Sequence, residues 1–334
     1  MLELMQTLCR LDGVSGCEDA VRDYIRAAAE PYADTILEDT IGNLLVYRKG
    51  ARYSGRTLML DAHMDEVGLI VTEITDDGFL KFGTSGSINA NVLLGTRVRI
   101  GAVRGVIGNK AVHLTSKEER KRLPEVRDMY IDIGAPSREA AEKLVSTGDF
   151  VAFDNEPAFY GNMIKAKAID DRVGCAVLLK ILQEGPPVDA WFAFTVMEEQ
   201  GTRGAAAAAY RIRPDLAIVL ETTTACDMPD LPAHLQVCCP GKGPVMPVMD
   251  NGTLYNPELL RRAFAIAAAR GIPCQTKSWV AGGTDASRIS KAAAGAKTVG
   301  VAAPVRYIHT PSSAMAVSDL EPMLALTRAL MEEL

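Results

Sequence analysis

The sequence has few of the residues on which many metal and disulfide sites depend. Its 334 residues include only four histidines. A zinc site built from three histidines would use nearly all of them, so any metal site here must rely on carboxylates. The seven cysteines form an odd set without a C-x-x-C pair. This argues against a disulfide framework or a zinc ribbon and indicates reduced, mostly buried thiols.

Long apolar runs and an excess of positive charge are also missing. No window approaches the roughly 18 apolar residues of a membrane span, so we expect no membrane partner. The opening residues, MLELMQTLCR, lack the basic region and apolar run of a signal peptide, which favours a cytoplasmic location. A formal net charge of −6 and a pI near 5.4 argue against nucleic acid as a partner, because phosphate binding needs a basic face.

What the chain does contain is enough apolar sequence, 48% of its residues, to bury a core in one large or two medium domains. The residue pattern changes near positions 68 and 160. Before the first change, Ser15 and Glu18 form an S-x-x-E capping box that predicts a helix from about Cys17 to Ala29. Between the two changes, short β-like runs alternate with turn signals, which predicts a small barrel or sandwich.

After residue 160, apolar strands alternate with helices. Helices are predicted over about 171–183, from 204, from the N-cap and proline of Asn256-Pro257 to Gly271, and from Ser318. Such alternation predicts an α/β fold with a mixed sheet covered by helices on both faces. We therefore predict an α/β domain formed by residues 1–67 and 161–334, interrupted by an inserted β-rich domain of residues 68–160.

Carboxylates and histidines follow four of the apolar runs. The run TLML leads into 61–66 (DAHMDE), WFAFTVM into Glu198-Glu199, LAIVL into Glu221, and KTVGVAAPVRYI into His309. In open α/β sheets, ligands bind outside the carboxyl ends of the strands. Four predicted strands that each end in a metal-ligating residue type therefore point to one metal site.

Each of these residues also has an ordinary structural explanation. His63 and Asp65 share one face of a strand, so the carboxylate can fix the imidazole tautomer beside a metal, but a surface turn explains the pair about as well. Asp170-Asp171 opens a predicted helix, where capping is the better single explanation. The two readings are compatible, because Asp171 can cap the helix while Asp170 points into a cleft and bridges two metals.

The pair Glu198-Glu199 is more informative. Adjacent carboxylates at the end of a buried strand repel each other and are costly to bury without a cation. One can ligate a metal while its neighbour takes a proton from water; the alternative is a solvated turn before Gly201. His309, before a Thr-Pro turn, is by itself more often structural, and we take His113 and His234 as non-ligands.

The glycine-rich stretch at 282–287, GGTDAS, has two interpretations. One is a glycine turn followed by a helix N-cap. The other is a loop at the rim of a substrate site, which would make Gly282, Gly283, Thr284 and Asp285 substrate-binding residues.

Six motifs together resemble the M42 family of metallo-aminopeptidases: LDAHMDEVG, KAIDDRVGCAVLL, FTVMEEQGTRGA, VLETTTACDMPD, GGTDAS and RYIHTPSS. The resemblance covers essentially the whole chain. It implies a two-metal exopeptidase fold in which a β-barrel-like dimerisation domain interrupts a catalytic α/β domain. It also implies two divalent ions per subunit, with zinc or cobalt expected and manganese as an alternative. Family members form homo-oligomers in which dimers assemble into a tetrahedral dodecamer.

Carried over motif by motif, the resemblance implies a role for each site residue. Glu198 would be the general base, Asp65 would orient His63, and the peptide bond between Asp170 and Asp171 would be cis. The five metal ligands would form two sites that share Asp170: His63, Asp170 and Glu221 in one, and Asp170, Glu199 and His309 in the other.

Two segments depart from the family pattern. Glu221, in LETTT, stands where much of the family has aspartate in a D-V-T motif; its longer carboxylate should still ligate, with metal preference left open. The segment GTSGSINANVLLG, at 83–95, lacks the aspartate-proline sequence that the family pattern leads us to expect there. Because it falls in the inserted domain, this departure bears on assembly more than on chemistry.

The predicted function is hydrolytic release of N-terminal residues from short peptides. A metal-dependent deacylase of N-acyl amino acids would use the same metals and base, and a non-catalytic assembly protein would keep only the scaffold. The presence of all five ligands and the base argues against the non-catalytic alternative. Glycoside hydrolysis by Glu198 and Glu199 is disfavoured, because adjacent residues are poorly placed to flank a bond with carboxyl groups ~5 Å or more apart.

Overall fold

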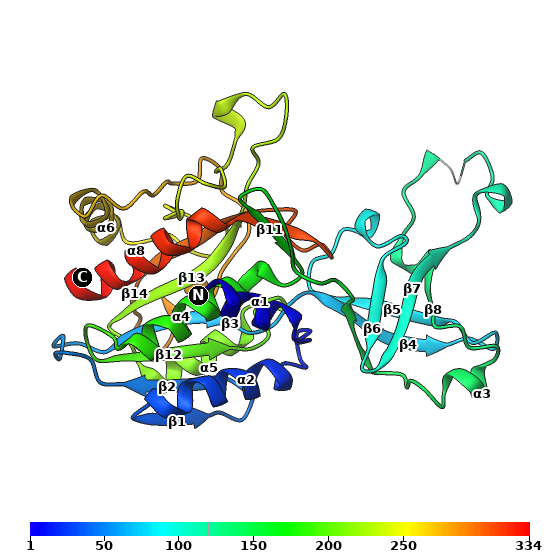
Figure 1. The fold of residues 1–334 in the computed structure, drawn as a ribbon, viewed down its shortest axis with the longest axis horizontal. Coiled ribbons are helices and arrows are strands. Elements are labelled where there is room, and N and C mark those ends of the chain that lie inside the picture. The colour runs from blue at the N-terminus through cyan, green and yellow to red at the C-terminus, as the bar shows by residue number, and fades with distance from the viewer. Residues whose placement is uncertain (119–120) are drawn as a thin grey trace.

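The computed structural model describes residues 1–118 and 121–334. Two units are visible within these residues: a large mixed sheet covered by helices, and a closed antiparallel barrel beside it (Figure 1). Both chain termini lie on the larger unit. This arrangement confirms the predicted fold class, an α/β sheet with an inserted β barrel.

The large sheet has parallel strands at its centre. Its described strands are β1 (Thr35–Glu38), β2 (Leu44–Arg48), β3 (Leu58–His63), β10 (Ala158–Tyr160), β11 (Met163–Ala166), β12 (Ala190–Thr195), β13 (Leu216–Thr224), β14 (Lys297–Arg306) and β15 (Ser313–Ala316). They lie in the order β1-β2-β12-β3-β13-β14-β15-β11-β10. The neighbours β12, β3, β13 and β14 pair in parallel, so their carboxyl ends meet at one edge of the sheet.

Helices cover both faces of this sheet because its strands alternate apolar side chains between the faces. In β2, Leu44 and Val46 pack on one face and Leu45 on the other. The first face carries α1 (Leu2–Arg10), α2 (Asp19–Ala29), α4 (Ile169–Glu184), α6 (Pro257–Ala269) and α8 (Leu320–Glu333). The second carries α5 (Arg203–Ile212) and α7 (Ala286–Ile289).

Two predicted helix starts had different outcomes. The Asn256-Pro257 start is confirmed, because the Asn256 side chain accepts from the backbone N–H groups of Glu258 and Leu259. The Ser15–Glu18 capping box is wrong, because the helix begins at Asp19 and Glu18 itself occupies the N-cap position. The Glu18 carboxylate instead accepts from the backbone N–H groups of Gly16 and Met197, at 2.8 and 3.1 Å.

The barrel forms the smaller unit. Its strands are β4 (Gly68–Ile74), β5 (Leu80–Ser85), β6 (Arg97–Ile100), β7 (Val103–Asn109), β8 (Met129–Asp132) and β9 (Phe150–Phe153), closed in the order β4-β5-β8-β7-β6-β9. A short helix, α3 (Arg138–Ala141), precedes β9 and is capped by Ser137. The described 3-10 turns are η1 (Glu30–Tyr32), η2 (Ala90–Val92), η3 (Val112–Leu114), η5 (Val126–Asp128), η6 (Ala233–Leu235) and η7 (Val317–Asp319). Closure pairs the strands, which leaves the barrel without open sheet edges.

The barrel joins the sheet next to the edge where the parallel strands end. Only four residues separate the end of β3 from the start of β4, and β9 leads within a few residues to β10 of the large sheet. Arg99 of β6 donates to the Asp12 carboxylate, at 2.6 and 2.8 Å, and ties the barrel to the segment between α1 and α2. None of the helices in the described residues is long and apolar enough to cross a bilayer.

Candidate metal centre

The predicted metal-ligating side chains gather at the carboxyl edge of the parallel strands. His63 is the last residue of β3, Glu199 follows β12, Glu221 lies on β13, and His309 follows β14. Asp170 reaches the same place from the first turn of α4, which packs on β3 and β13. The structure therefore brings together all five residues that the sequence pointed to.

Two groups of candidate ligands share one aspartate. His63 Nε2 lies 3.4 Å from Asp170 Oδ1 and 3.3 Å from Glu221 Oε1. His309 Nε2 lies 3.3 Å from Asp170 Oδ2 and 3.3 Å from Glu199 Oε1. Within each group the ligand atoms lie within 4.8 Å of one another. The two oxygens of Asp170 thus face different groups, as a bridging carboxylate requires.

The backbone at Asp170 supports this orientation. The peptide bond between Asp170 and Asp171 is cis, which confirms the expectation from the family resemblance. Both residues depart from helical φ and ψ values inside α4. Asp171 turns into the helix, where its carboxylate accepts from the Gly174 backbone N–H at 3.0 Å. Asp170 is left to face the two histidines.

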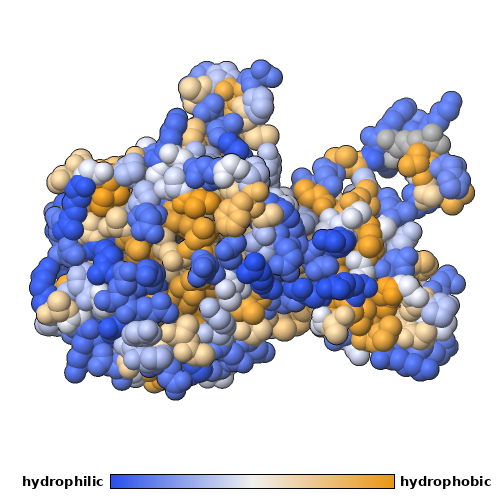
Figure 2. Space-filling model, viewed as in Figure 1, coloured by the Kyte–Doolittle hydropathy of each residue, from blue (hydrophilic) through white to orange (hydrophobic). Residues whose placement is uncertain are grey.

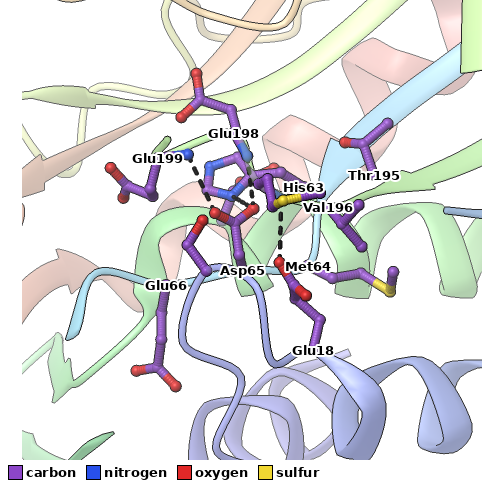
Figure 3. A network of polar contacts seen from close by, with 12 residues as sticks. Glu18, His63, Met64, Asp65, Glu66, Thr195, Val196, Glu198 and Glu199 are labelled. Carbon is purple, nitrogen blue, oxygen red and sulfur yellow. Dashed lines mark hydrogen bonds and ion pairs between the residues drawn. The ribbon is translucent and has the colours of Figure 1, made fainter. Parts of the chain in front are cut away.

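Asp65 connects the first group to the turn that carries the glutamates. It is fully buried, and its two carboxylate oxygens accept from the backbone N–H groups of Glu198 and Glu199, at 2.9 and 3.1 Å (Figure 3). One of these oxygens also lies 3.3 Å from His63 Nδ1. Burial opposes ionisation, but the contacts with His63 and with the Glu198 N–H outweigh it and lower the pKa of Asp65.

The charge balance of the cluster fits divalent cations. Burial and the neighbouring Asp170 and Asp171 raise the pKa of Glu221 well above its ordinary value, against the opposing effect of His63. Asp170 Oδ1 is buried and, within the described residues, has no hydrogen-bond partner. Two imidazoles and three carboxylates form a nitrogen and oxygen ligand set that suits zinc, cobalt or manganese. The residues present therefore fit two divalent ions.

A cavity of about 520 Å³ opens beside these groups. Glu198 lines it, next to the metal-ligating candidates, and its side chain points away from Asp65 in Figure 3. Burial raises the pKa of Glu198 well above its ordinary value, and the nearby carboxylates add to this effect while His63 opposes it. A carboxylate that is hard to ionise in a cleft has the character of a proton-transfer group.

The predicted substrate loop lies only partly on the cavity wall. Gly282, Gly283 and Thr284 line the cavity. Asp285 instead lies beneath the wall, 1% exposed, where its carboxylate accepts from Thr195 Oγ1 at 2.7 Å. Burial raises the pKa of Asp285 to about 6. The sequence of a glycine turn followed by a helix start does not show which way the first side chain of the helix points. Only the tertiary structure shows that Asp285 lies beneath the wall while the three residues before it line the cavity.

Among the described charged residues of the cavity wall, one was missed by the sequence analysis. Lys277 lines the cavity wall and carries a charge opposite to that of the carboxylates. Its ammonium donates to the Ala281 carbonyl at 2.8 Å. Burial lowers its pKa. The surrounding sequence, TKSWV, has no pattern that could have placed Lys277 in a binding site. His113 and His234 are exposed and belong to neither ligand group.

Comparison with known proteins shows which family the chain resembles over most of its length. The family model described as M42 glutamyl aminopeptidase matches residues 42–326. The lysyl aminopeptidase of Pyrococcus furiosus is 30% identical over 346 residues, 99% of this chain and 97% of the relative.

Solved structures agree over the full length. A TET aminopeptidase from a marine sediment archaeon, Thaumarchaeota archaeon SCGC AB-539-E09, is 35% identical with a TM-score of 0.95, covering 100% of this chain and 96% of that chain. The TET1 peptidase of Pyrococcus horikoshii is 32% identical with a TM-score of 0.87, covering 100% and 99%. It is described as assembling into a tetrahedron or a large octahedral shell, and another TET structure is a dodecamer.

Proposed function

Because the chain belongs to the M42 glutamyl aminopeptidase family and is an aminopeptidase, we propose that it releases N-terminal residues from short peptides with two metal ions and a glutamate base. The observation that carries this proposal is the pair of ligand groups sharing Asp170, with Glu198 on the wall of the same cavity.

Each residue has a distinct task in this mechanism. His63, Asp170 and Glu221 would hold one ion, and Asp170, Glu199 and His309 the other. When bound, the ions would supply Lewis-acid polarisation of the scissile carbonyl and a lowered pKa for water. Glu198 takes the proton of the attacking water and delivers it to the leaving amine.

Asp65 keeps this arrangement in place. Its two carboxylate oxygens hold the backbone of Glu198 and Glu199, so the base and a ligand sit on one rigid turn. The same carboxylate faces His63 Nδ1, which leaves Nε2 directed at Asp170 and Glu221.

The peptide would bind along the wall formed by Gly282, Gly283 and Thr284. Apart from the adjoining residues, none of the described residues has an atom within 4 Å of the position where a Cβ would be at Gly282 or Gly283, so a substrate backbone can approach closely. Asp285 contributes from below by accepting a hydrogen bond from Thr195, the last residue of β12.

The test is the Glu198→Gln variant. We expect it to bind two equivalents of Zn²⁺ as the wild type does, while turnover of an aminoacyl anilide falls by about 10²–10⁴. Glu142→Gln, on the exposed surface of the barrel, is the matched control and should change neither quantity. Near-native turnover by Glu198→Gln would refute the assignment of the base.

Substrate class and metal are separated by one panel. Chelated protein, reloaded with zinc, cobalt or manganese, is assayed on aminoacyl anilides and on N-acyl amino acids. Activity confined to the anilides supports the peptidase, and activity confined to the N-acyl compounds supports the deacylase. No bound metal and no activity would leave the non-catalytic alternative.

Assembly through the barrel is the remaining part of the proposal. Val106, Val112, Leu114 and Leu123 expose large apolar side chains on the barrel, and Figure 2 shows apolar patches on its surface. Such patches suit a surface that is covered by a partner. We expect dimers through the barrel that build a dodecamer, measured by sedimentation velocity; a monomer at all concentrations would contradict this. The cytoplasmic location stays a prediction.

A further inference from the structure

The loop that carries His309 is held in an unusual backbone conformation. Tyr307 and His309 have φ values of +59° and +57°, in the left-handed region that residues other than glycine seldom adopt. Inside the loop, Thr310 Oγ1 donates to the Tyr307 carbonyl at 2.7 Å. Two positive φ values so close together require support from the surrounding structure.

Part of that support comes from the barrel. His309 Nδ1 lies 3.0 Å from the carbonyl oxygen of Ser87, which can only accept a hydrogen bond. Ser87 follows β5 of the barrel. A neutral imidazole that donates through Nδ1 carries its lone pair on Nε2, and Nε2 is the atom that faces Asp170 and Glu199. The barrel therefore determines the tautomer and the ring orientation of His309.

A second contact reaches the same loop. Asn155, in the connection that follows β9, donates through Nδ2 to the Pro311 carbonyl at 2.6 Å. Its Oδ1 accepts from Lys165 Nζ, on β11 of the large sheet. The Asn155 amide thus holds the His309 loop to the connection that leaves the barrel, at a point two residues beyond the histidine.

The segment from Ser85 to Ser87 is itself fitted against the metal-ligating turn. Ser85 Oγ accepts from Gln200 Nε2 at 3.0 Å and donates to the Ser15 carbonyl at 3.2 Å. Gly86 has φ +90°, and a Cβ added there would lie 3.3 Å from the Cβ of Glu199. A glycine is needed for this close approach.

The two ligand groups consequently differ in their support. His63 and Glu221 lie on strands of the large sheet, whereas Glu199 and His309 both contact the barrel or its connections. We propose that the clamp, defined as Ser85–Ser87 together with Asn155, is a positioning element. Through it the barrel sets the geometry of the second metal site, which is the site formed by Asp170, Glu199 and His309. This inference rests on the proposed function, because it takes His309 as a metal ligand. It makes the inserted barrel necessary for a competent metal centre as well as for assembly.

Asn155→Asp tests the clamp through a single side chain. The change keeps a side-chain oxygen that can accept from Lys165. It replaces the amide NH₂ group, which donates to the Pro311 carbonyl, with a carboxylate oxygen that cannot donate. Loss of a group that bonds a metal ligand directly weakens metal binding about 10–100-fold. Because Pro311 lies two residues from His309, we expect about a tenfold loss, at the low end of that range, and only at the site formed by Asp170, Glu199 and His309. Lys165→Met is the matched control: it removes the other contact of Asn155, leaves the Pro311 bond, and should retain wild-type Zn²⁺ affinity. Zn²⁺ binding is measured by competition with a chromophoric chelator.

Gly86→Ala tests the clamp from its other side. The added methyl group would press on Val67, at 2.7 Å, and on Glu199. Gly148→Ala controls for backbone strain, because Gly148 has a similar φ of +95° but, apart from its chain neighbours, no described residue within 4 Å of its Cβ position. We expect Gly86→Ala to weaken Zn²⁺ binding at the second metal site and to alter the visible spectrum of the Co²⁺-loaded protein. Gly148→Ala should change the stability of the fold alone.

His309→Gln separates failure of the clamp from failure of the proposed function. If the wild type binds two Zn²⁺ and His309→Gln binds one, the metal centre stands. Unchanged second-site affinity in Asn155→Asp and Gly86→Ala would then overturn the clamp. If His309→Gln binds Zn²⁺ as the wild type does, His309 is not a ligand and the proposed metal centre fails first. Thermal unfolding of each variant shows which ones retain the fold and can be compared.

Discussion

Asp65 is the residue whose replacement most directly tests the geometry of the metal centre. Asp65→Asn keeps the size of the side chain but leaves one acceptor oxygen where three contacts now converge: two backbone N–H groups and His63 Nδ1. In either orientation of the amide, an NH₂ group faces a hydrogen-bond donor. The Glu198–Glu199 turn or the imidazole must therefore lose its partner.

The size of the effect follows from the contact that is lost. A hydrogen bond to a charged group contributes about 1.5–3 kcal/mol, and Asp65 is fully buried, so solvent does not replace it. Since about 1.4 kcal/mol corresponds to a tenfold change, Zn²⁺ affinity and turnover should each fall about 10–100-fold. The loss should appear in the His63 site when NH₂ replaces the oxygen that faces His63 Nδ1 and the Glu198 N–H, and in the Glu199 site when it replaces the oxygen that faces the Glu199 N–H.

Asp319→Asn provides the matched control. Asp319 is also a buried aspartate that accepts from two backbone N–H groups, those of Gly241 and Gly243, but it contacts no member of either ligand group. Its substitution should lower the free energy of unfolding without changing Zn²⁺ affinity. Binding is measured by chelator competition and stability by urea unfolding of the metal-free protein. Equal Zn²⁺ affinities for Asp65→Asn and the wild type would refute the positioning role of Asp65.

Three further results are expected. Burial lowers the pKa of His309, but Asp170 and Glu199 outweigh burial and raise this pKa to about 11. Zn²⁺ binding at pH 7 must therefore displace the proton of His309, and Zn²⁺ affinity should rise with pH. Calorimetry in buffers of different ionisation enthalpy that detected no proton release would contradict this. Lys277→Met should lower kcat/KM about tenfold for glutamyl anilides relative to leucyl anilides, because a cation is lost from the cavity wall; equal losses would exclude a charge contact. Arg172→Met should destabilise the metal-free protein by about 2–5 kcal/mol in urea unfolding, because the fully buried guanidinium donates to the buried backbone carbonyls of Met64 and Leu8, which would lose their donor; a change below ~1 kcal/mol would show that these hydrogen bonds are not needed.

Several features of the fold were accessible from the sequence because their signals are local. The Asn256-Pro257 helix start depends on a side chain two or three residues from the N–H groups that it caps. The apolar runs that end in His63, Glu199, Glu221 and near His309 predicted one site, because parallel strands bring their carboxyl ends to one edge. The roles of the individual ligands came from the family resemblance.

Other features depend on contacts between distant segments. Glu18 matches the local pattern of a capping box, but its carboxylate accepts from Met197, 179 residues away, and so supports the turn before Glu198. Lys277 lines the cavity because its loop is held by a distant segment: the Ser278 N–H donates to the Val237 carbonyl at 3.1 Å. The close approach of Gly86 to Glu199 depends on how the barrel is seated against the sheet.

The sequence by itself determined the alternation of strands and helices, the insertion of a β-rich segment, and the residue types that meet at the strand ends, because periodic burial and strand-end chemistry are properties of short segments. The tertiary structure decided that Asp170 faces both histidines, that Asp285 lies beneath the cavity, and that Ser87 accepts from His309. The last contact uses a backbone carbonyl, which every residue has. Its partner is therefore set by the placement of the barrel in space and leaves no mark in the sequence.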